Sequence, residues 1–213
     1  MGERTVIIYV GVGKGPFRDA VRAAGHGQMV SIHAFRVPEA GRWAFDNGAY
    51  KDWIKKRPFS EALFLAKLAE VMTFQPCRRP DFAVVPDRVA DPQSLSISVE
   101  WRKRLPDELR WYLAVQDGMS ARDVDAALTV VRFDGIFVGG TTDWKLRTGG
   151  EWVGFAHQRR MPCHVGRVNP SRFSPRVRWA LDIGADSVDG NGWQRDPKAY
   201  HWINLPEPEP KLW

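Results

Sequence analysis

Short apolar segments recur along the chain, and each ends at a glycine or at a polar residue such as Asp, Asn or Gln. Short apolar runs bounded by turn-forming residues are typical of buried β-strands. We therefore predict eight strands: Thr5–Val10, Met29–Ile32, Trp43–Phe45, Phe82–Val85, Tyr112–Val115, Gly135–Val138, Cys163–Val165 and Asp186–Val188.

Polar segments with helical periodicity separate these strands. After Ser60, the residues Leu63, Leu68 and Val71 recur at helical spacing, and Ser60 is a suitable N-cap. Ser120 is predicted to cap a second helix in the same way. The predicted helices are Phe17–Ala24, Ser60–Phe74, Pro92–Arg104, Ala121–Val131, Asp143–Arg159 and Ser171–Asp182.

Alternation of buried strands with helices predicts an α/β protein with a parallel sheet. Eight strands favour a compact (β/α)8 TIM-like barrel over an open doubly wound sheet. Since 213 residues is near the lower limit for such barrels, some helices must be short or missing, and the link between the second and third strands is especially brief. We expect one domain over residues 1–204 and an extended Pro/Glu-rich tail over residues 205–213.

Composition describes an ordinary globular protein, with 44% hydrophobic and 26% charged residues. These fractions exclude a disordered or coiled-coil chain. The chain has 31 Lys and Arg against 25 Asp and Glu, a formal net charge of +6. This balance favours a nucleic-acid or phosphate partner, although a solvated basic surface would give the same count.

The cysteine and histidine pattern predicts neither a disulfide framework nor a metal site. Cys77 and Cys163 are far apart, and the five histidines are scattered. We expect no metal and no cofactor. Neither a leader sequence nor an apolar run of about 18 residues is found, so a cytoplasmic protein without membrane contact is expected.

Polar residues and glycines follow almost every predicted strand, where the carboxyl ends of parallel strands meet at one rim. Each group alone could be a turn, because Asp-Gly and Asn-Gly are common turn formers. Together they predict a functional site at this rim. The groups are Asp46-Asn47-Gly48, Asp87-Arg88, Gln116-Asp117-Gly118, Gly139-Gly140, Gly166-Arg167 and Asp189-Gly190-Asn191-Gly192.

Several other residues carry weaker signals. Gly11-Val12-Gly13-Lys14-Gly15 matches neither a P-loop nor a dinucleotide fingerprint, and a tight turn is expected there. His33, His157 and His164 are interpreted as packed or surface residues. Tryptophans are expected in the core, although Trp193 could line a base pocket because it follows Asp189 closely.

The ordered set of rim motifs resembles the tRNA-guanine transglycosylases. The segment 46–50 resembles their Asp-Ser-Gly-Gly-Phe motif, the segment 112–118 their Val-Gln-Gly-Gly segment, and the segment 137–140 their Gly-Gly-Leu loop. The segment 184–190 is similar to their Gly-x-Asp-x-Phe-Asp segment, and Asp87 takes the place of their base-recognising aspartate. These motifs span about two thirds of the chain, from Asp46 to Asn191.

The resemblance implies a role for each matched residue. Asp189 would be the nucleophile and Asp46 the general acid/base. The substrate base would be held by Asp87, Gln116, Gly139 and Gly140, with Asn47 and Trp193 beside it. Arg167, with Lys14 and Lys145 as companions, is predicted to hold nucleic-acid phosphate at the mouth; the alternative for Arg167 is an ion pair with Asp186.

The substrate follows from the branch of the family that the chain resembles most. The Asn-Gly-Ala and Gly-Gly-Thr variants, Ser-Val-Asp-Gly and His-Val-Gly-Arg-Val-Asn resemble the DpdA-type transglycosylases of phages and bacteria, which insert a 7-deazaguanine into DNA. The zinc-binding subdomain of the tRNA enzymes is absent from the sequence. DNA and a base such as preQ0 or a derivative are therefore the expected partners. A tRNA-directed enzyme and a non-catalytic nucleic-acid-binding barrel are the alternatives.

Overall fold

The computed structural model describes residues 6–11, 16–169, 176–190 and 192. Eight parallel strands pair in sequence order, and the last pairs with the first, which closes a barrel. The predicted single-domain (β/α)8 barrel is thus confirmed, and the open sheet is not formed. The strands are β1 (Ile7–Gly11), β2 (Gly27–Ser31), β3 (Arg42–Asp46), β4 (Ala83–Val84), β5 (Trp111–Val115), β6 (Gly135–Val138), β7 (Cys163–Val165) and β8 (Ser187–Gly190).

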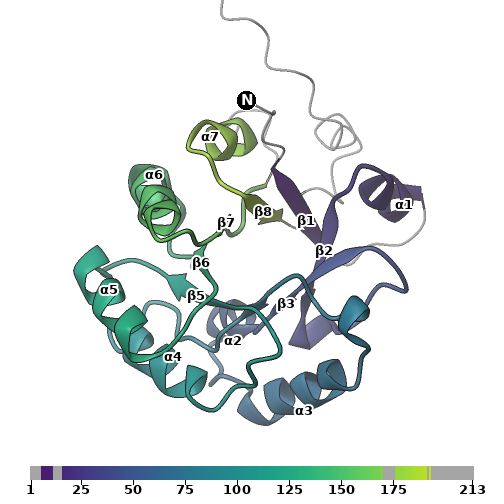
Figure 1. The fold of residues 1–213 in the computed structure, drawn as a ribbon, viewed down its shortest axis with the longest axis horizontal. Helices are drawn as coiled ribbons and strands as arrows, with labels where there is room; N and C mark the ends of the chain where they lie inside the picture. The colour runs from purple at the N-terminus through teal and green to yellow at the C-terminus, as the bar shows by residue number, and fades with distance from the viewer. Residues whose placement is uncertain (1–5, 12–15, 170–175, 191, 193–213) are drawn as a thin grey trace, which may run out of the picture.

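Helices surround the barrel (Figure 1). The link between β2 and β3 contains only the 3₁₀ turn η1 (Ile32–Ala34), which agrees with its predicted brevity. A second 3₁₀ turn, η2 (Pro76–Arg78), precedes β4. The α-helices of the described segments are α1 (Pro16–Ala23), α2 (Ala49–Ile54), α3 (Glu61–Met72), α4 (Ser94–Arg102), α5 (Ala121–Val130), α6 (Thr142–Gln158) and α7 (Arg176–Asp182).

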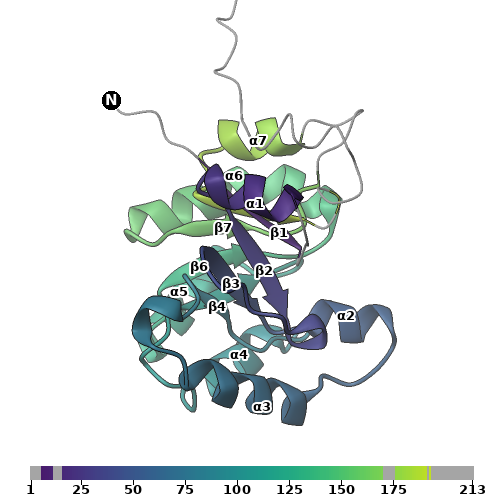
Figure 2. The same ribbon diagram turned by 90° about the vertical axis from the view of Figure 1, so that its right-hand side faces the viewer.

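Helix α2 is an α-helix that the sequence pattern did not predict. Its six residues follow Gly48 directly and are too few to show a helical period. Gly48 has φ +78°, and a Cβ there would lie 2.6 Å from an Ile32 side-chain carbon, so only glycine fits this turn. Figure 2 shows α2 projecting from the end of the molecule toward which the arrow of β2 points.

The two predicted N-caps differ in detail. The Ser120 side chain accepts a hydrogen bond from the Asp123 amide, as predicted. Ser60 takes the N-cap position of α3, but its hydroxyl makes no capping bond. Its backbone N–H instead donates to Asp52 Oδ2 at 3.1 Å, which ties α3 to α2. The part of the predicted helix before Arg176, residues 171–175, and the tail 205–213 lie outside the described residues.

Strand side chains alternate between two cores. Outward-facing residues such as Ile8, Val10 and Phe45 pack against the helices in the larger core. Inward-facing residues fill the barrel with a smaller cluster that includes Tyr9, Phe82 and Tyr112. The Phe82 and Tyr112 rings stack inside the barrel with their centroids 4.2 Å apart, so aromatic side chains fill part of its interior.

No helix among the described segments is long and apolar enough to cross a membrane.

Candidate active site

The period of two along each strand places three sequence-predicted residues inside the mouth of the barrel. Asp46 follows inward-facing Ala44 by two positions, and Gln116 follows Ala114 in the same way. Asp189 follows Ser187, whose hydroxyl lies inside the barrel against His164. A cavity of about 190 Å³ results. Its walls are Met29, Ser31, Asp46, Asn47, Tyr50, Val84, Asp87, Val89, Gln116, Phe137, Gly139, Gly140, Arg167 and Asp189.

Asp189 is held through one of its two carboxylate oxygens. Oδ1 accepts a hydrogen bond from the Arg167 amide at 3.0 Å, and His164 Nε2 lies 3.0 Å from the same oxygen. Among the described residues, Oδ2 has no hydrogen-bond partner. The side chain is therefore oriented while one oxygen stays available toward the cavity.

Asp46 ends strand β3 and lines the same cavity. Burial raises its pKa to about 6, and the negative charge of Asp189 adds to the shift. The backbone N–H of Gly48 opposes the shift because it stabilises the carboxylate. Near neutral pH this group can therefore both give and take a proton.

Asp87 is buried, and both of its oxygens accept hydrogen bonds from side-chain amides. Asn47 Nδ2 donates to Oδ1 at 2.8 Å, and Gln116 Nε2 donates to Oδ2 at 3.1 Å. Burial nevertheless raises the pKa of Asp87 to about 6, and the charge of Asp46 contributes to this shift. The three aspartates are thus electrostatically coupled from Asp189 through Asp46 to Asp87.

Asn47 and Gln116 lie in the site, but as supports for Asp87. Asn47 also donates to the Val85 carbonyl at 2.8 Å and accepts from the Ala49 amide at 2.8 Å. Gln116 Nε2 also contacts the Ser94 hydroxyl at 2.7 Å, and its oxygen accepts from the Ala90 amide at 2.9 Å. With these groups engaged, neither amide is free to donate to a substrate base.

The two glycines after β6 differ in what their N–H groups contact. The Gly139 N–H donates to the Val115 carbonyl at 2.8 Å, so it is part of the sheet. Among the described residues the Gly140 N–H has no acceptor, and Gly140 lines the cavity. Gly140 has a φ of +67°, and a Cβ at this position would lie 2.5 Å from a Trp144 ring carbon. The position therefore requires glycine. Of the two, Gly140 is the candidate donor to a ligand.

Arg167 lies at the mouth, as predicted. Its guanidinium donates to the Gly140 carbonyl and lies 4.1 Å from the centroid of the Tyr50 ring. Within the described segments it forms no ion pair: Asp186, its predicted alternative partner, instead contacts His157 Nε2 at 2.8 Å. The guanidinium therefore bridges two walls of the cavity.

Lys145 is close to the site but does not reach its surface. The side chain is buried and its ammonium donates to the Gly166 carbonyl. Burial lowers the pKa of Lys145 to about 7; the positive charge of Arg167 acts in the same direction, and Asp189 opposes it. A phosphate at the mouth cannot reach this ammonium in the observed arrangement. Lys14 and Trp193, the other two predicted contacts, lie outside the described residues.

His164 and Tyr50 are site residues whose position the sequence interpretation missed. The sequence indicates a packed or surface position for His164; the side chain is fully buried and also contacts Asp189. The alternation of inward- and outward-facing positions predicts it, because His164 is the middle residue of β7 and its neighbours Cys163 and Val165 belong to the outer core. Tyr50 was noted only as part of a motif, and the unpredicted helix α2 brings it to the cavity.

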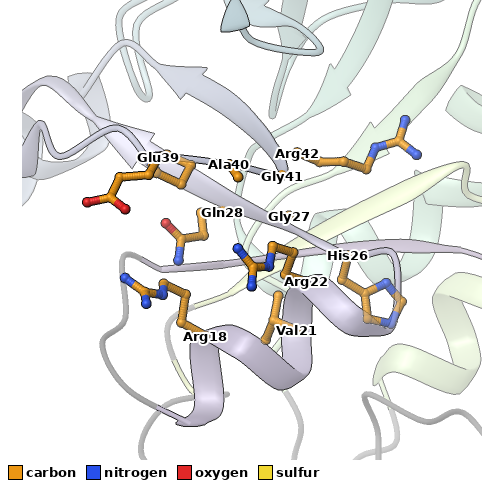
Figure 3. Close-up of a pocket in the computed structure, with 11 residues that line it drawn as sticks. Arg18, Val21, Arg22, His26, Gly27, Gln28, Glu39, Ala40, Gly41 and Arg42 are labelled. Atoms are coloured by element: carbon orange, nitrogen blue, oxygen red, sulfur yellow. The ribbon is translucent and has the colours of Figure 1, made fainter.

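A smaller cavity of about 40 Å³ lies at the opposite end of the barrel, where β2 and β3 begin. Figure 3 shows Arg18 and Arg22 of α1 beside Gln28 and Glu39 in this cavity. Chemistry in (β/α)8 barrels is located at the carboxyl ends of the strands, so the cavity that holds Asp46, Asp87 and Asp189 is the candidate active site. Within the described part of the chain, no group of three or more His, Cys, Asp or Glu residues is arranged to hold a metal ion.

Comparison with known proteins gives distant structural similarities. No protein-family model and no curated protein matches the chain. Orotidine 5′-monophosphate decarboxylase from Sulfolobus solfataricus is 15% identical with a TM-score of 0.47, and 94% of this chain and 96% of that one are covered. 3-Hexulose-6-phosphate synthase from Salmonella typhimurium is 12% identical with a TM-score of 0.49, and the alignment covers 93% of this chain and 95% of that one.

These similarities concern the fold alone. Neither protein is a transglycosylase, and the resemblance of the motifs to that family stays a prediction.

Proposed function

We propose that this protein is an enzyme, a DNA-guanine transglycosylase that exchanges guanine in DNA for a 7-deazaguanine base through a covalent intermediate on Asp189. The observation that carries the proposal is the meeting of Asp189, Asp46 and Asp87 in one cavity, with the charges of the three coupled. N-glycosidic exchange through an oxocarbenium-like transition state needs one carboxylate to attack and another to handle the proton.

The first step breaks the bond between the sugar and guanine. Asp189 Oδ2, the oxygen without a partner among the described residues, attacks C1′ from the face opposite the base. The C1′–N9 bond breaks and its electron pair leaves with guanine. Asp46 in its protonated form supplies the proton that neutralises the departing base, a role that suits a carboxyl group with a pKa of about 6.

The second step reverses this chemistry with the new base. The Asp46 carboxyl, restored to its ionised form, takes the N9 proton of the incoming 7-deazaguanine. N9 then attacks C1′ and the bond between C1′ and Asp189 breaks, which frees the carboxylate. Two inversions at C1′ restore the original configuration, and no external energy source is needed.

Recognition of the base falls to Asp87 and Gly140. A carboxylate accepts hydrogen bonds, and the N1–H and exocyclic amine of guanine donate them. Asn47 and Gln116 hold Asp87 from its two oxygens and fix the direction in which it accepts. The Gly140 N–H, which has no acceptor among the described residues, is a donor that suits the O6 atom of the base.

DNA is proposed over tRNA because the motif variants resemble the DNA-modifying branch. In either polymer the target base must be unpaired or flipped, because a cavity inside the barrel mouth accepts a base only outside its stack. The remaining alternative is a non-catalytic nucleic-acid-binding barrel. A binding function of this kind does not explain why Asp46 and Asp87, each with a pKa of about 6, share a cavity with Asp189.

Mass spectrometry of nucleosides tests the proposal. The protein is incubated with preQ0 and either single-stranded DNA or tRNA, and the nucleic acid is then digested. We expect a 7-deazaguanine deoxynucleoside from DNA and none from the same reaction with Asp189→Asn. Modified nucleoside from tRNA alone would favour the RNA-directed enzyme, and none from either polymer would contradict catalysis of base exchange.

A further inference from the structure

Helix α2 and the turn after it expose an unusual group of apolar side chains. Tyr50, Trp53 and Ile54 are 39%, 45% and 56% exposed, and they are three of the large hydrophobic side chains exposed in the described part of the chain. Tyr50 and Trp53 stand one helical turn apart, with ring centroids 5.8 Å from each other. A contiguous exposed apolar group beside a site is typical of a surface that binds a ligand or partner.

Positive charge is concentrated in the same segment of the chain. Four exposed cations, Lys51, Lys55, Lys56 and Arg57, lie between residues 49 and 57, against one acid, Asp52. Four positive charges minus one negative charge give a local excess of +3. Asp52 is buried and accepts a hydrogen bond from Arg57 at 2.7 Å, so it presents no negative charge to a ligand on the surface.

A second cavity, of about 330 Å³, opens beside this helix. Trp53 lines it, and its charged wall residues are Arg57 and Arg88 together with the acids Asp52, Glu61, Asp87 and Asp91. It shares Asp87 and Val89 with the active-site cavity, so these two residues form the partition between the cavities. Arg88 is well exposed and lies 3.6 Å from Asp91, its acidic neighbour in the loop.

We propose that the second cavity and the exposed face of α2, together called the α2 surface, bind a nucleotide adjacent to the target in a single-stranded nucleic acid. This inference rests on the proposed function and concerns its polymeric substrate. A base can stack on the half-exposed Trp53 ring while phosphates lie near Lys51, Lys55 and Arg88. Stacking on aromatic side chains within a basic groove is how proteins bind single strands without reading their sequence.

Charge complementarity favours this occupant over another protein. Lysine is depleted at protein–protein interfaces, whereas the segment 50–56, which holds the aromatic pair, carries three exposed lysines. A polyanion matches this combination. An unpaired strand is favoured over a duplex because stacking on Trp53 needs an accessible base face.

Fluorescence anisotropy with a labelled single-stranded oligodeoxynucleotide that contains one guanine tests the stacking. Trp53→Leu keeps an apolar side chain but removes the aromatic plane, and we expect it to weaken binding about 5- to 100-fold. Trp53→Phe should recover most of the affinity. An oligonucleotide with abasic sites on both sides of the guanine should bind wild type weakly and should make wild type and Trp53→Leu nearly equal.

Salt dependence tests the charges. The Lys51→Ala/Lys55→Ala double variant should lower the slope of log affinity against log salt by about 1.4, because each phosphate contact on a single strand contributes about 0.7. Arg18→Ala/Arg22→Ala is the matched control. It removes two exposed cations from α1 beside the cavity at the opposite end of the barrel, and its slope should equal that of wild type.

Three outcomes would overturn the inference while leaving base exchange intact. Trp53→Leu could bind the oligonucleotide as tightly as wild type does. Alternatively, the Lys51→Ala/Lys55→Ala and Arg18→Ala/Arg22→Ala variants could show the same decrease in the slope of log affinity against log salt. Trp53→Leu could also change the sedimentation of the free protein while its DNA affinity stays the same, which would make α2 a protein interface. If wild type instead binds the oligonucleotide but exchanges no base, the proposed function fails while the α2 surface stands.

Discussion

His164 Nε2 lies 3.0 Å from Asp189 Oδ1, inside the barrel and shielded from solvent. The other ring nitrogen lies 2.8 Å from the Ser187 hydroxyl, and the ring stacks on Phe137 with centroids 4.8 Å apart. The histidine is thus fixed on both sides. Because it contacts the oxygen that also accepts from the Arg167 amide, it helps to orient Asp189, a side chain that lines the cavity.

Replacement of this histidine tests its role as a positioning residue. His164→Ala should lower kcat for base exchange about 10- to 100-fold and leave KM for the base nearly unchanged, because a misplaced nucleophile affects the chemical step. Ser187→Ala, which removes one hydrogen bond of the ring but leaves the ring and its contact with Asp189, is the milder comparison and should have a smaller effect. Steady-state kinetics with labelled guanine give both constants, and an unchanged kcat in His164→Ala would exclude the role.

Asp189 itself is tested by a nearly isosteric change. Asp189→Asn should abolish exchange of labelled guanine because an amide oxygen is too weak a nucleophile to attack C1′. The melting temperature should change little. Covalent protein–oligonucleotide adduct, trapped by denaturation during turnover and separated on a gel, should form with wild type alone. Full exchange activity in the variant would assign the nucleophile elsewhere.

Asp46 is expected to reduce stability at neutral pH in return for its chemistry. Its folded-state pKa of about 6 exceeds the ordinary value of 3.8, so between these values the folded protein binds more protons than the unfolded chain. Stability therefore falls as pH rises from about 4 to about 6, and the full cost applies above pH 6. Asp46→Asn should stabilise the protein at pH 7.5 by about 1–3 kcal/mol and have less effect at pH 4.

Urea unfolding at the two pH values measures this difference. The same substitution should slow base exchange by about 10²- to 10⁴-fold, the usual loss for a missing general acid/base, as should Asp46→Ala. Equal stability of wild type and Asp46→Asn at both pH values would show that the carboxyl group is not desolvated in the folded protein.

Asp87 is predicted to bind the base. Asp87→Asn should mainly weaken affinity for the 7-deazaguanine, because an amide presents a donor where the base also donates. It also places an amide against the donors of Asn47 and Gln116, so its folding must be checked by circular dichroism. Calorimetric titration with preQ0 gives the affinity. An affinity equal to that of wild type would remove Asp87 from the base pocket.

Arg167 can hold phosphate if its guanidinium leaves the Gly140 carbonyl and the Tyr50 ring when nucleic acid binds. Arg167→Ala should then lower the slope of log DNA affinity against log salt by about 0.7 to 0.9. Because alanine retains the backbone N–H that donates to Asp189, nucleophile orientation should persist. If wild type and Arg167→Ala have the same DNA affinity and the same salt slope, Arg167 does not contact phosphate. Its role is then structural, between the Gly140 carbonyl and the Tyr50 ring.

Local sequence pattern was enough to predict the barrel and most of its rim. Buried strands need short apolar runs and the turns after them need glycine or small polar residues, so the eight strands and residues such as Asp46, Gln116 and Asp189 could be found from local pattern alone. Helix α2 was not predicted, because six residues are too few to show a helical period. The exposed positions of Tyr50 and Trp53 on this helix were therefore not predicted either.

Which polar groups can reach a ligand, and which support another side chain, depends on the folded arrangement of the chain. Asn47 and Gln116 occupy the predicted places, yet their amides are used on Asp87 and the neighbouring backbone. Lys145 is drawn beneath the rim to the Gly166 carbonyl, where burial lowers its pKa. Hydrogen-bond partners and desolvation depend on residues distant in the chain, and a local pattern does not contain them.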